Sequence, residues 1–171
     1  MALWDDNSFP LAYLITFRTY GTWLHGDERG SIDRYHNRFR GARVTANPVI
    51  LRQHETKLKS EPVLLNSRQR PIVEASIREV CKFRQWRIQA VNIRTNHIHV
   101  VVSIGEIGPD KAVKDFKAYA TRALKAAGHW QFDHSPWAEG SSKKYLWKES
   151  SVANACEYVV NGQGIDLPES F

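Results

Sequence analysis

Two histidines, His97 and His99, stand two residues apart in the segment TNHIHVVVS, which is rich in β-branched residues. Side chains alternate between the two faces of a strand, so these imidazoles point the same way and lie about 7 Å apart at the backbone. The apolar residues that begin with Ile98 face the opposite side, where helices can cover them. Imidazole is the commonest metal ligand, and two of them on one face can share a divalent ion. The spacing alone leaves a metal site and two histidines on a solvated face equally open.

Two tyrosines follow the histidines on segments that we predict to be helical, and a tyrosine oxygen can attack phosphorus to form a covalent phosphotyrosine. Tyr119 lies beside an apolar stripe that contains Phe116, so we interpret it as a packing residue. Tyr158 shares a helical face with Asn154 and Asn161, which predicts a phenol on a polar face where it could meet a bound phosphate. A surface tyrosine without a chemical role is the alternative.

Basic residues recur at helical spacing within 111–127, where Lys114, Lys117 and Lys125 are joined by Arg122. Such a track can follow the phosphates of a nucleic acid, although a solvated helix face has the same pattern. The formal net charge of +6 suits a nucleic-acid partner but is weak support by itself. The six tryptophans could stack on unpaired bases, although a core position is the default for any one of them.

Hydrophobic periodicity predicts the elements that position these residues. Strands are expected over 11–18, 87–94, 97–104 and 144–148, and helices over 67–86, 111–127 and 151–162. Thr95 and Asn96 form the expected hairpin turn between the strands over 87–94 and 97–104. Ser67 and Ser151 are the expected N-caps, and Gly128 the expected C-cap. Strands and helices interleave without regular βαβ repetition, which favours an α+β sandwich with helices packed on a mostly antiparallel sheet.

The chain has 171 residues, 42% of them hydrophobic and 25% charged, which suits one globular domain and excludes wholesale disorder. We therefore expect a single domain over 1–171, with a basic, loop-rich excursion at about 21–62 that includes a short helix near 48–59. Cys81 and Cys156 are too few for a disulfide framework and lack a neighbouring cysteine for a zinc ribbon.

No apolar run approaches the roughly 18–20 residues of a membrane span. The start, MALWDDNSFP, carries acid where a signal peptide has a basic region. These features predict a cytoplasmic protein without a membrane partner.

Several segments, in order, resemble the single-tyrosine transposases of the insertion-sequence-200-like and REP-associated group. HIH fits their HUH motif, in which U is apolar, and LITFRTYG resembles their first strand. VKDFKAYATRAL resembles the lysine-bearing helix after the HUH strand. YLWKESSVANACEYVVNGQG resembles the closing tract, which holds the nucleophilic tyrosine and a downstream amide. HIH alone is weakly specific, whereas the ordered set is strongly specific.

The resemblance implies a ferredoxin-like α+β fold and a transposase that cuts and rejoins single-stranded DNA with hairpin or palindromic ends. It implies that Tyr158 attacks a phosphodiester, giving a 5′-phosphotyrosine and a free 3′-hydroxyl. It also implies that His97 and His99 hold a divalent metal, Mg²⁺ or Mn²⁺. An oxygen-poor ligand set favours Mn²⁺ on affinity, while Mg²⁺ is the abundant cellular ion.

The third metal ligand is open at the sequence level. The family usually carries Gln or Asn four residues after the tyrosine, a position that is Gly162 here. Asn161 would stay on the helical face of Tyr158, while Gln163 would reach it only if Gly162 ends the helix and lets the chain turn back. The GQG segment slightly favours Gln163.

Two other functions remain open. The chain could be a DNA-binding relative that has lost cleavage, or a metal-dependent nuclease that uses activated water without a covalent intermediate. The resemblance also allows either a monomer or a homodimer whose sheets join edge to edge.

Overall fold

The computed structural model of the chain describes residues 8–22, 48 and 61–163. Its elements are β1 (Ala12–Arg18), α2 (Gln69–Arg84), β2 (Arg87–Ile93), β3 (His97–Ser103), α3 (Pro109–Ala126), β4 (Ser142–Leu146) and α4 (Glu149–Asn161). Most of the basic excursion predicted at 21–62, including its helix near 48–59, lies outside the described residues. Within the described part of the chain, no helix has the length and apolarity needed to cross a membrane.

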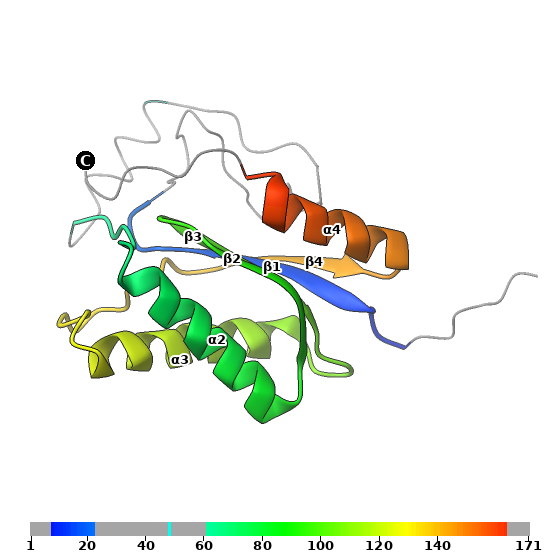
Figure 1. The fold of residues 1–171 in the computed structure, drawn as a ribbon, viewed down its shortest axis with the longest axis horizontal. Coiled ribbons are helices and arrows are strands. Elements are labelled where there is room, and N and C mark those ends of the chain that lie inside the picture. Colours follow the sequence, from blue (N-terminus) through cyan, green and yellow to red (C-terminus); the bar gives the residue numbers. More distant parts are fainter. Residues whose placement is uncertain (1–7, 23–47, 49–60, 164–171) are drawn as a thin grey trace, which may run out of the picture.

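The four strands form one antiparallel sheet in the order β2-β3-β1-β4. β3 lies between β1 and β2, and β1 lies between β3 and β4, so the two βαβ units interleave. This is the ferredoxin-like arrangement, and it confirms the predicted α+β sandwich. Figure 1 shows α2 and α3 on one face of the sheet and α4 on the other.

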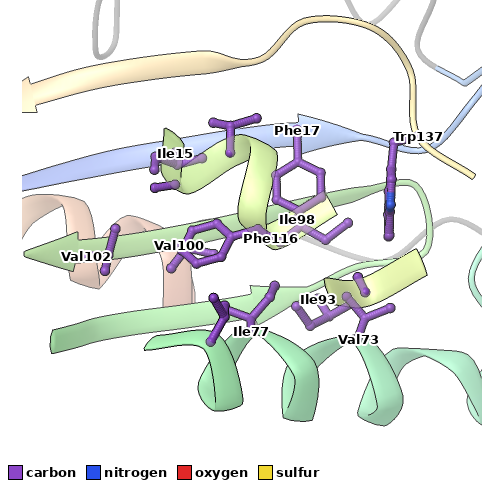
Figure 2. Packing of buried hydrophobic residues seen from close by; sticks show 14 of the residues in the cluster. Ile15, Phe17, Val73, Ile77, Ile93, Ile98, Val100, Val102, Phe116 and Trp137 are labelled. Atoms are coloured by element: carbon purple, nitrogen blue, oxygen red, sulfur yellow. The ribbon is translucent and has the colours of Figure 1, made fainter. Parts of the chain in front are cut away.

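The larger hydrophobic core fills the space between the sheet and the pair α2 and α3 (Figure 2). Ile98, Val100 and Val102 of β3 point into it and are fully buried, as predicted for the face opposite the histidines. A smaller apolar cluster lies under α4 and consists of Ala12, Leu14, Ala90, Val101, Leu146, Ala155 and Val159. β3 is therefore packed on both faces, which makes it a rigid support for side chains that carry chemistry.

The strand register determines which polar side chains surround the histidines. Opposite residues in an antiparallel pair point to the same face of the sheet. Thr16 of β1 and Asn92 of β2 both lie opposite His99, and Arg18 of β1 lies opposite His97. The α4 face of the sheet therefore gathers polar side chains from three adjacent strands.

The turn from β2 to β3 is buried rather than solvated. The N–H of Arg94 donates to the carbonyl of His97 at 2.9 Å, which closes the turn over Thr95 and Asn96 where the sequence predicted it. Both turn residues are buried, and the N–H of Thr19 donates to the carbonyl of Asn96 at 3.0 Å. Asn96 is consequently held in place beside the first histidine.

The helix starts differ from the sequence-based expectations. Ser67 does not cap α2, because Asn66 does: its side-chain oxygen accepts from the N–H groups of Arg68 and Gln69, each at 2.9 Å. α3 starts at Pro109, two residues earlier than expected, because proline fits the first turn of a helix, where no N–H is needed.

The predictions for Ser151 and Phe83 also need correction. α4 begins at Glu149, so Ser151 lies inside the helix and is not its N-cap, and β4 spans 142–146 rather than 144–148. Phe83 follows Ile77 and Val80 at an approximate helical period, which predicts it on the apolar side of α2, but it is 69% exposed. Six residues of helix turn by about 600°, which places Phe83 about 120° away from the buried Ile77.

Candidate functional site

His97 and His99 lie side by side on the face of β3 that α4 covers. Their ring centroids are 4.6 Å apart, with an angle of 77° between the ring planes. The residues are only 8% and 4% exposed, respectively. The alternative of two histidines on a solvated face is therefore wrong.

The ring nitrogens of both histidines are oriented by neighbouring side chains. Thr16 Oγ1 lies 2.7 Å from Nδ1 of His99, and Asn96 Oδ1 lies 2.6 Å from Nδ1 of His97. On the other side of the His97 ring, Nε2 lies 3.3 Å from Oε1 of Gln163. Such contacts set the tautomer and the orientation of an imidazole, as they do for histidines that bind metals.

The two ring nitrogens of His97 each face the side-chain oxygen of an amide. An amide oxygen only accepts hydrogen bonds, so Asn96 Oδ1 requires the proton on Nδ1 of His97. In the neutral ring, Nε2 then presents a lone pair to Oε1 of Gln163, which is also an acceptor. Two lone pairs that face each other fit a positive charge between them. Two imidazoles and one amide oxygen are donors that Mg²⁺ or Mn²⁺ can use.

Within the described residues, no group of three or more His, Cys, Asp or Glu side chains could hold a metal ion. An amide oxygen is a suitable third protein ligand for a metal at the histidine pair, and Gln163 has such an oxygen near His97. Phosphate and water would supply the remaining ligands of an octahedral ion.

The ring of Tyr158 packs edge-on against His99, with centroids 5.7 Å apart and an angle of 71° between the ring planes. Tyr158 is half-buried and contacts the small apolar cluster under α4. The side-chain amide of Asn92 donates to the carbonyl of Val159 at 2.9 Å, which fastens the helix to β2. The predicted polar face for Tyr158 needs correction, because Asn154 is exposed while the phenol turns toward the sheet.

Gly162 ends α4 and lets the chain turn back toward the histidines. Its N–H donates to the carbonyl of Tyr158 at 2.9 Å. The amide nitrogen of Gln163 donates to the same carbonyl, also at 2.9 Å, which directs Oε1 toward His97. The side chain of Asn161 is exposed and donates to Glu157 at 2.9 Å. The structure thus brings Gln163 to the histidines and leaves Asn161 outside the site.

Three further polar side chains on the face of the sheet that carries the histidines were not identified from the sequence. Thr16 contacts His99 directly, and Arg18 lies opposite His97, where burial lowers the pKa of its guanidinium. Lys144 of β4 is buried on the same face of the sheet, because it lies opposite Leu14 of the α4 cluster. The signal was present in LITFR, where Thr and Arg occupy alternate positions of an otherwise apolar strand.

The model of the family described as "Transposase IS200 like" matches residues 56–161, which is more than half of the chain. The chain belongs to this family. No curated protein sequence matches the chain.

Two solved structures resemble this IS200-like transposase. A candidate transposase from Deinococcus radiodurans has 12% sequence identity and a TM-score of 0.51, and the match covers 96% of this chain and 100% of that one. A REP-associated tyrosine transposase bound to a REP hairpin has 10% identity and a TM-score of 0.48, and the match covers 93% of this chain and 70% of that one. At such identity, the first similarity shows that the fold is shared.

α3, which carries the basic residues, lies on the face of the sheet opposite α4 (Figure 1), whereas the histidines lie on the α4 face. Lys114 and Lys125 are exposed, and the guanidinium of Arg122 lies 4.7 Å from the ring centre of Tyr119. Tyr119 packs against the larger core, as predicted. In this family member, the four basic residues and the histidine pair therefore occupy different layers.

Lys117 differs from the other three cations because it is tied to the protein. Its ammonium donates to the carbonyls of Ala138 and Gly140 at 2.9 and 2.8 Å. Burial lowers its pKa, and the positive charges of Arg18 and Lys143 add to this effect. Lys117 therefore fastens α3 to the loop that precedes β4.

Proposed function

We propose that this IS200-like transposase cuts and rejoins single-stranded DNA, with Tyr158 as the nucleophile and His97, His99 and Gln163 as ligands of Mg²⁺ or Mn²⁺. The single observation that carries the proposal is the edge-on contact between Tyr158 and His99, on a face where Gln163 also reaches His97. Family membership supports the coarser statement that the chain is a transposase.

The proposed reaction is a transesterification at phosphorus. The Tyr158 hydroxyl gives up its proton and its oxygen forms a bond to phosphorus, while the bond between phosphorus and the 3′ oxygen breaks. The departing oxygen takes up a proton to become a 3′-hydroxyl, so the step has no net change in protons. The 5′ end stays on the tyrosine as a phosphodiester, so a new 3′-hydroxyl can reverse the step without an external energy source. Polarisation of a non-bridging phosphate oxygen is the chemistry that the bound divalent ion supplies.

The residues of the chain itself contribute orientation and charge. Thr16 and Asn96 hold the two imidazoles, and the packing of α4 on the sheet places the phenol against His99. Arg18, next to His97, brings a fixed positive charge to the position where a phosphate would lie. We propose that the exposed cations of α3, Lys114 among them, bind DNA phosphates farther along the strand.

Covalent trapping tests the nucleophile. The full chain is incubated with Mn²⁺ and single-stranded DNA copied from the sequences that flank its own gene, chosen to include any hairpin-forming segment there. The DNA carries its label on the 3′ side, because that fragment stays on the protein. We expect a labelled protein band on a denaturing gel for the wild type and for Tyr119→Phe, and none for Tyr158→Phe.

Each other result of the trapping experiment assigns a different function. A labelled band that persists in Tyr158→Phe and disappears in Tyr119→Phe would reverse the choice of tyrosine. Cut DNA without a protein band would indicate a nuclease that uses activated water. Bound DNA that is neither cut nor trapped would indicate a DNA-binding relative without cleavage.

Calorimetric titration with Mn²⁺ tests the ligand set separately from the chemistry. His97→Ala and His99→Ala should abolish binding, and Gln163→Ala should weaken it. Asn161→Ala is the matched control, because it removes a similar amide that contacts Glu157 instead. A double histidine variant that binds Mn²⁺ like the wild type would refute the site.

A further inference from the structure

The loop between α3 and β4 contains three aromatic rings in mutual contact. Trp130 packs against Phe132 and His134, with ring centroids 5.0 and 5.2 Å apart, respectively. Phe132 and His134 lie 5.5 Å apart with only 31° between their planes. Trp130 is buried, whereas Phe132 is 60% exposed. The buried indole thus supports a phenylalanine ring that faces solvent.

Hydrogen bonds hold this loop in one conformation. The indole N–H of Trp130 donates to the carbonyl of His134 at 2.9 Å, and the side-chain amide of Gln69 donates to the carbonyl of His129 at 3.0 Å. The indole N–H of Trp137 donates to the carbonyl of Lys117 at 3.1 Å. An ordered loop that leaves a phenylalanine ring in water forgoes the free energy of burying that ring. The exposed ring is therefore held in one position, where a flat partner could stack on it without ordering the loop.

The same loop is joined to the end of the sheet that carries His97 (Figure 1). The N–H of Ala138 donates to the carbonyl of Arg18 at 2.9 Å, and the N–H of Tyr20 donates to the carbonyl of Pro136 at 2.8 Å. The ring of Tyr20 lies 5.1 Å from that of His134. Arg18 is the residue opposite His97, and two residues of extended chain span about 7 Å. The backbone that carries the aromatic cluster is therefore joined to the residues that flank His97, while its rings pack on the side of the sheet that α2 and α3 cover.

Charges near the loop suit a polyanion. Arg122 and Lys125 are exposed on the last turns of α3, which leads directly into the loop. The loop itself carries two acidic residues, Asp133 and Glu139, which are also exposed. The exposed rings, chiefly Phe132, are too small for a protein interface, since one aromatic side chain buries about 150–250 Å² while stable complexes bury about 800 Å² per partner.

The geometry points to a stacking platform, formed by Phe132, His134 and Tyr20, for one unpaired nucleobase of the strand that Tyr158 would cut. This inference rests on the proposed function and adds a binding subsite to it. The planar face of a base suits an exposed phenyl ring, and stacking does not depend on base identity, since every base has a π-face. The nearby cations would contact the phosphates on either side of that base.

The test measures the affinity of the full chain for the same hairpin-forming DNA with a single-stranded flank, by fluorescence anisotropy. Phe132→Ala should weaken binding about five- to 140-fold, the range found for loss of one base–aromatic stack. The dependence of binding on salt should not change, because no charge is removed. Phe132→Trp should retain affinity. Phe83→Ala is the matched control, since Phe83 is 69% exposed on α2 and should not contribute.

Abasic substitutions then locate the stacked base. One abasic position in the flank should weaken DNA binding by the wild type as much as Phe132→Ala does. The same abasic position should not weaken DNA binding by Phe132→Ala any further. Wild-type affinity in Phe132→Ala, with the Tyr158 adduct still formed, would overturn the platform and leave the proposed function intact. Loss of the adduct in the wild type would instead refute the function. A change of sedimentation in Phe132→Ala, without a change in affinity for DNA, would overturn the platform in favour of a contact between copies.

Discussion

Gly162 provides the sharpest test of how the end of α4 positions Tyr158. A Cβ atom at this position would lie 2.9 Å from the carbonyl oxygen and 3.0 Å from Cδ2 of Tyr158. The backbone torsions of Gly162 (φ −95°, ψ 7°) are accessible to alanine, so the contact itself is the obstacle. Ordinary contacts begin at 3.4 Å, so Gly162→Ala must push the end of the helix and the tyrosine apart by about 0.5 Å.

The expected losses of stability and of activity differ in size. Overpacking costs about 1–3 kcal/mol, while alanine in place of glycine returns about 0.4–1 kcal/mol by restricting the unfolded chain. The net loss of about 1–2 kcal/mol corresponds to a Tm lowered by only a few degrees. The reaction rate is more sensitive than stability to such a shift, since misplacing a reacting group by 1 Å can lower the rate on the order of 100-fold. We therefore expect adduct formation to slow at least about tenfold in a protein that remains folded.

The assay is the initial rate of adduct formation, measured beside thermal unfolding. Gly108→Ala is the matched control, because its φ is −72° and a Cβ there meets nothing within 4 Å. The control should react like the wild type. A Gly162→Ala protein with the wild-type rate would show that the placement of Tyr158 does not depend on this close approach, and the reasoning would be wrong.

Three other predictions concern positioning, capping and DNA binding. Thr16→Val removes a hydroxyl 2.7 Å from a candidate ligand and should weaken Mn²⁺ binding about 10- to 100-fold in calorimetry; an unchanged isotherm would contradict this role. Asn66→Ala should lower the free energy of unfolding by about 1 kcal/mol, whereas Ser67→Ala, the control, should change it by less than about 0.5 kcal/mol; equal losses would refute the cap. Charge reversal at Lys114 and Lys125 should reduce the slope of log K against log salt by about one to two units, and an unchanged slope would place the DNA elsewhere.

The parts of the fold that sequence predicted well are those with a strong periodic pattern. β3 alternates two histidines with buried aliphatic residues, and α3 repeats apolar residues every three or four positions, with Phe116 and Leu124 fully buried. Helix ends were less predictable, because a cap depends on one hydrogen bond and several nearby side chains can supply it. Asn66 and Ser67 are adjacent and both are good caps, so local geometry decided between them.

The surroundings of the candidate site depended on contacts between distant parts of the chain. The proximity of Thr16 and Arg18 to the histidines comes from the pairing of β1 with β3, which no local pattern reveals. Polarity also misled the reasoning for Tyr158, because polar was equated with exposed. α4 rests on a face of the sheet that carries imidazoles and a threonine, so its inward side includes a half-buried phenol.

The way in which α4 is attached suggests how the protein could release and exchange a DNA end. Tyr158 and Gln163 both belong to the end of this helix, whereas the histidines belong to a strand packed on both faces. A helix held by a small cluster can open at a lower free energy than the main core, and hydrogen exchange would detect this as faster exchange in α4 than in α2. One such opening would withdraw the tyrosine and the amide ligand together. A DNA end joined to Tyr158 would then travel with the helix, while the strand that carries the imidazoles stays in place.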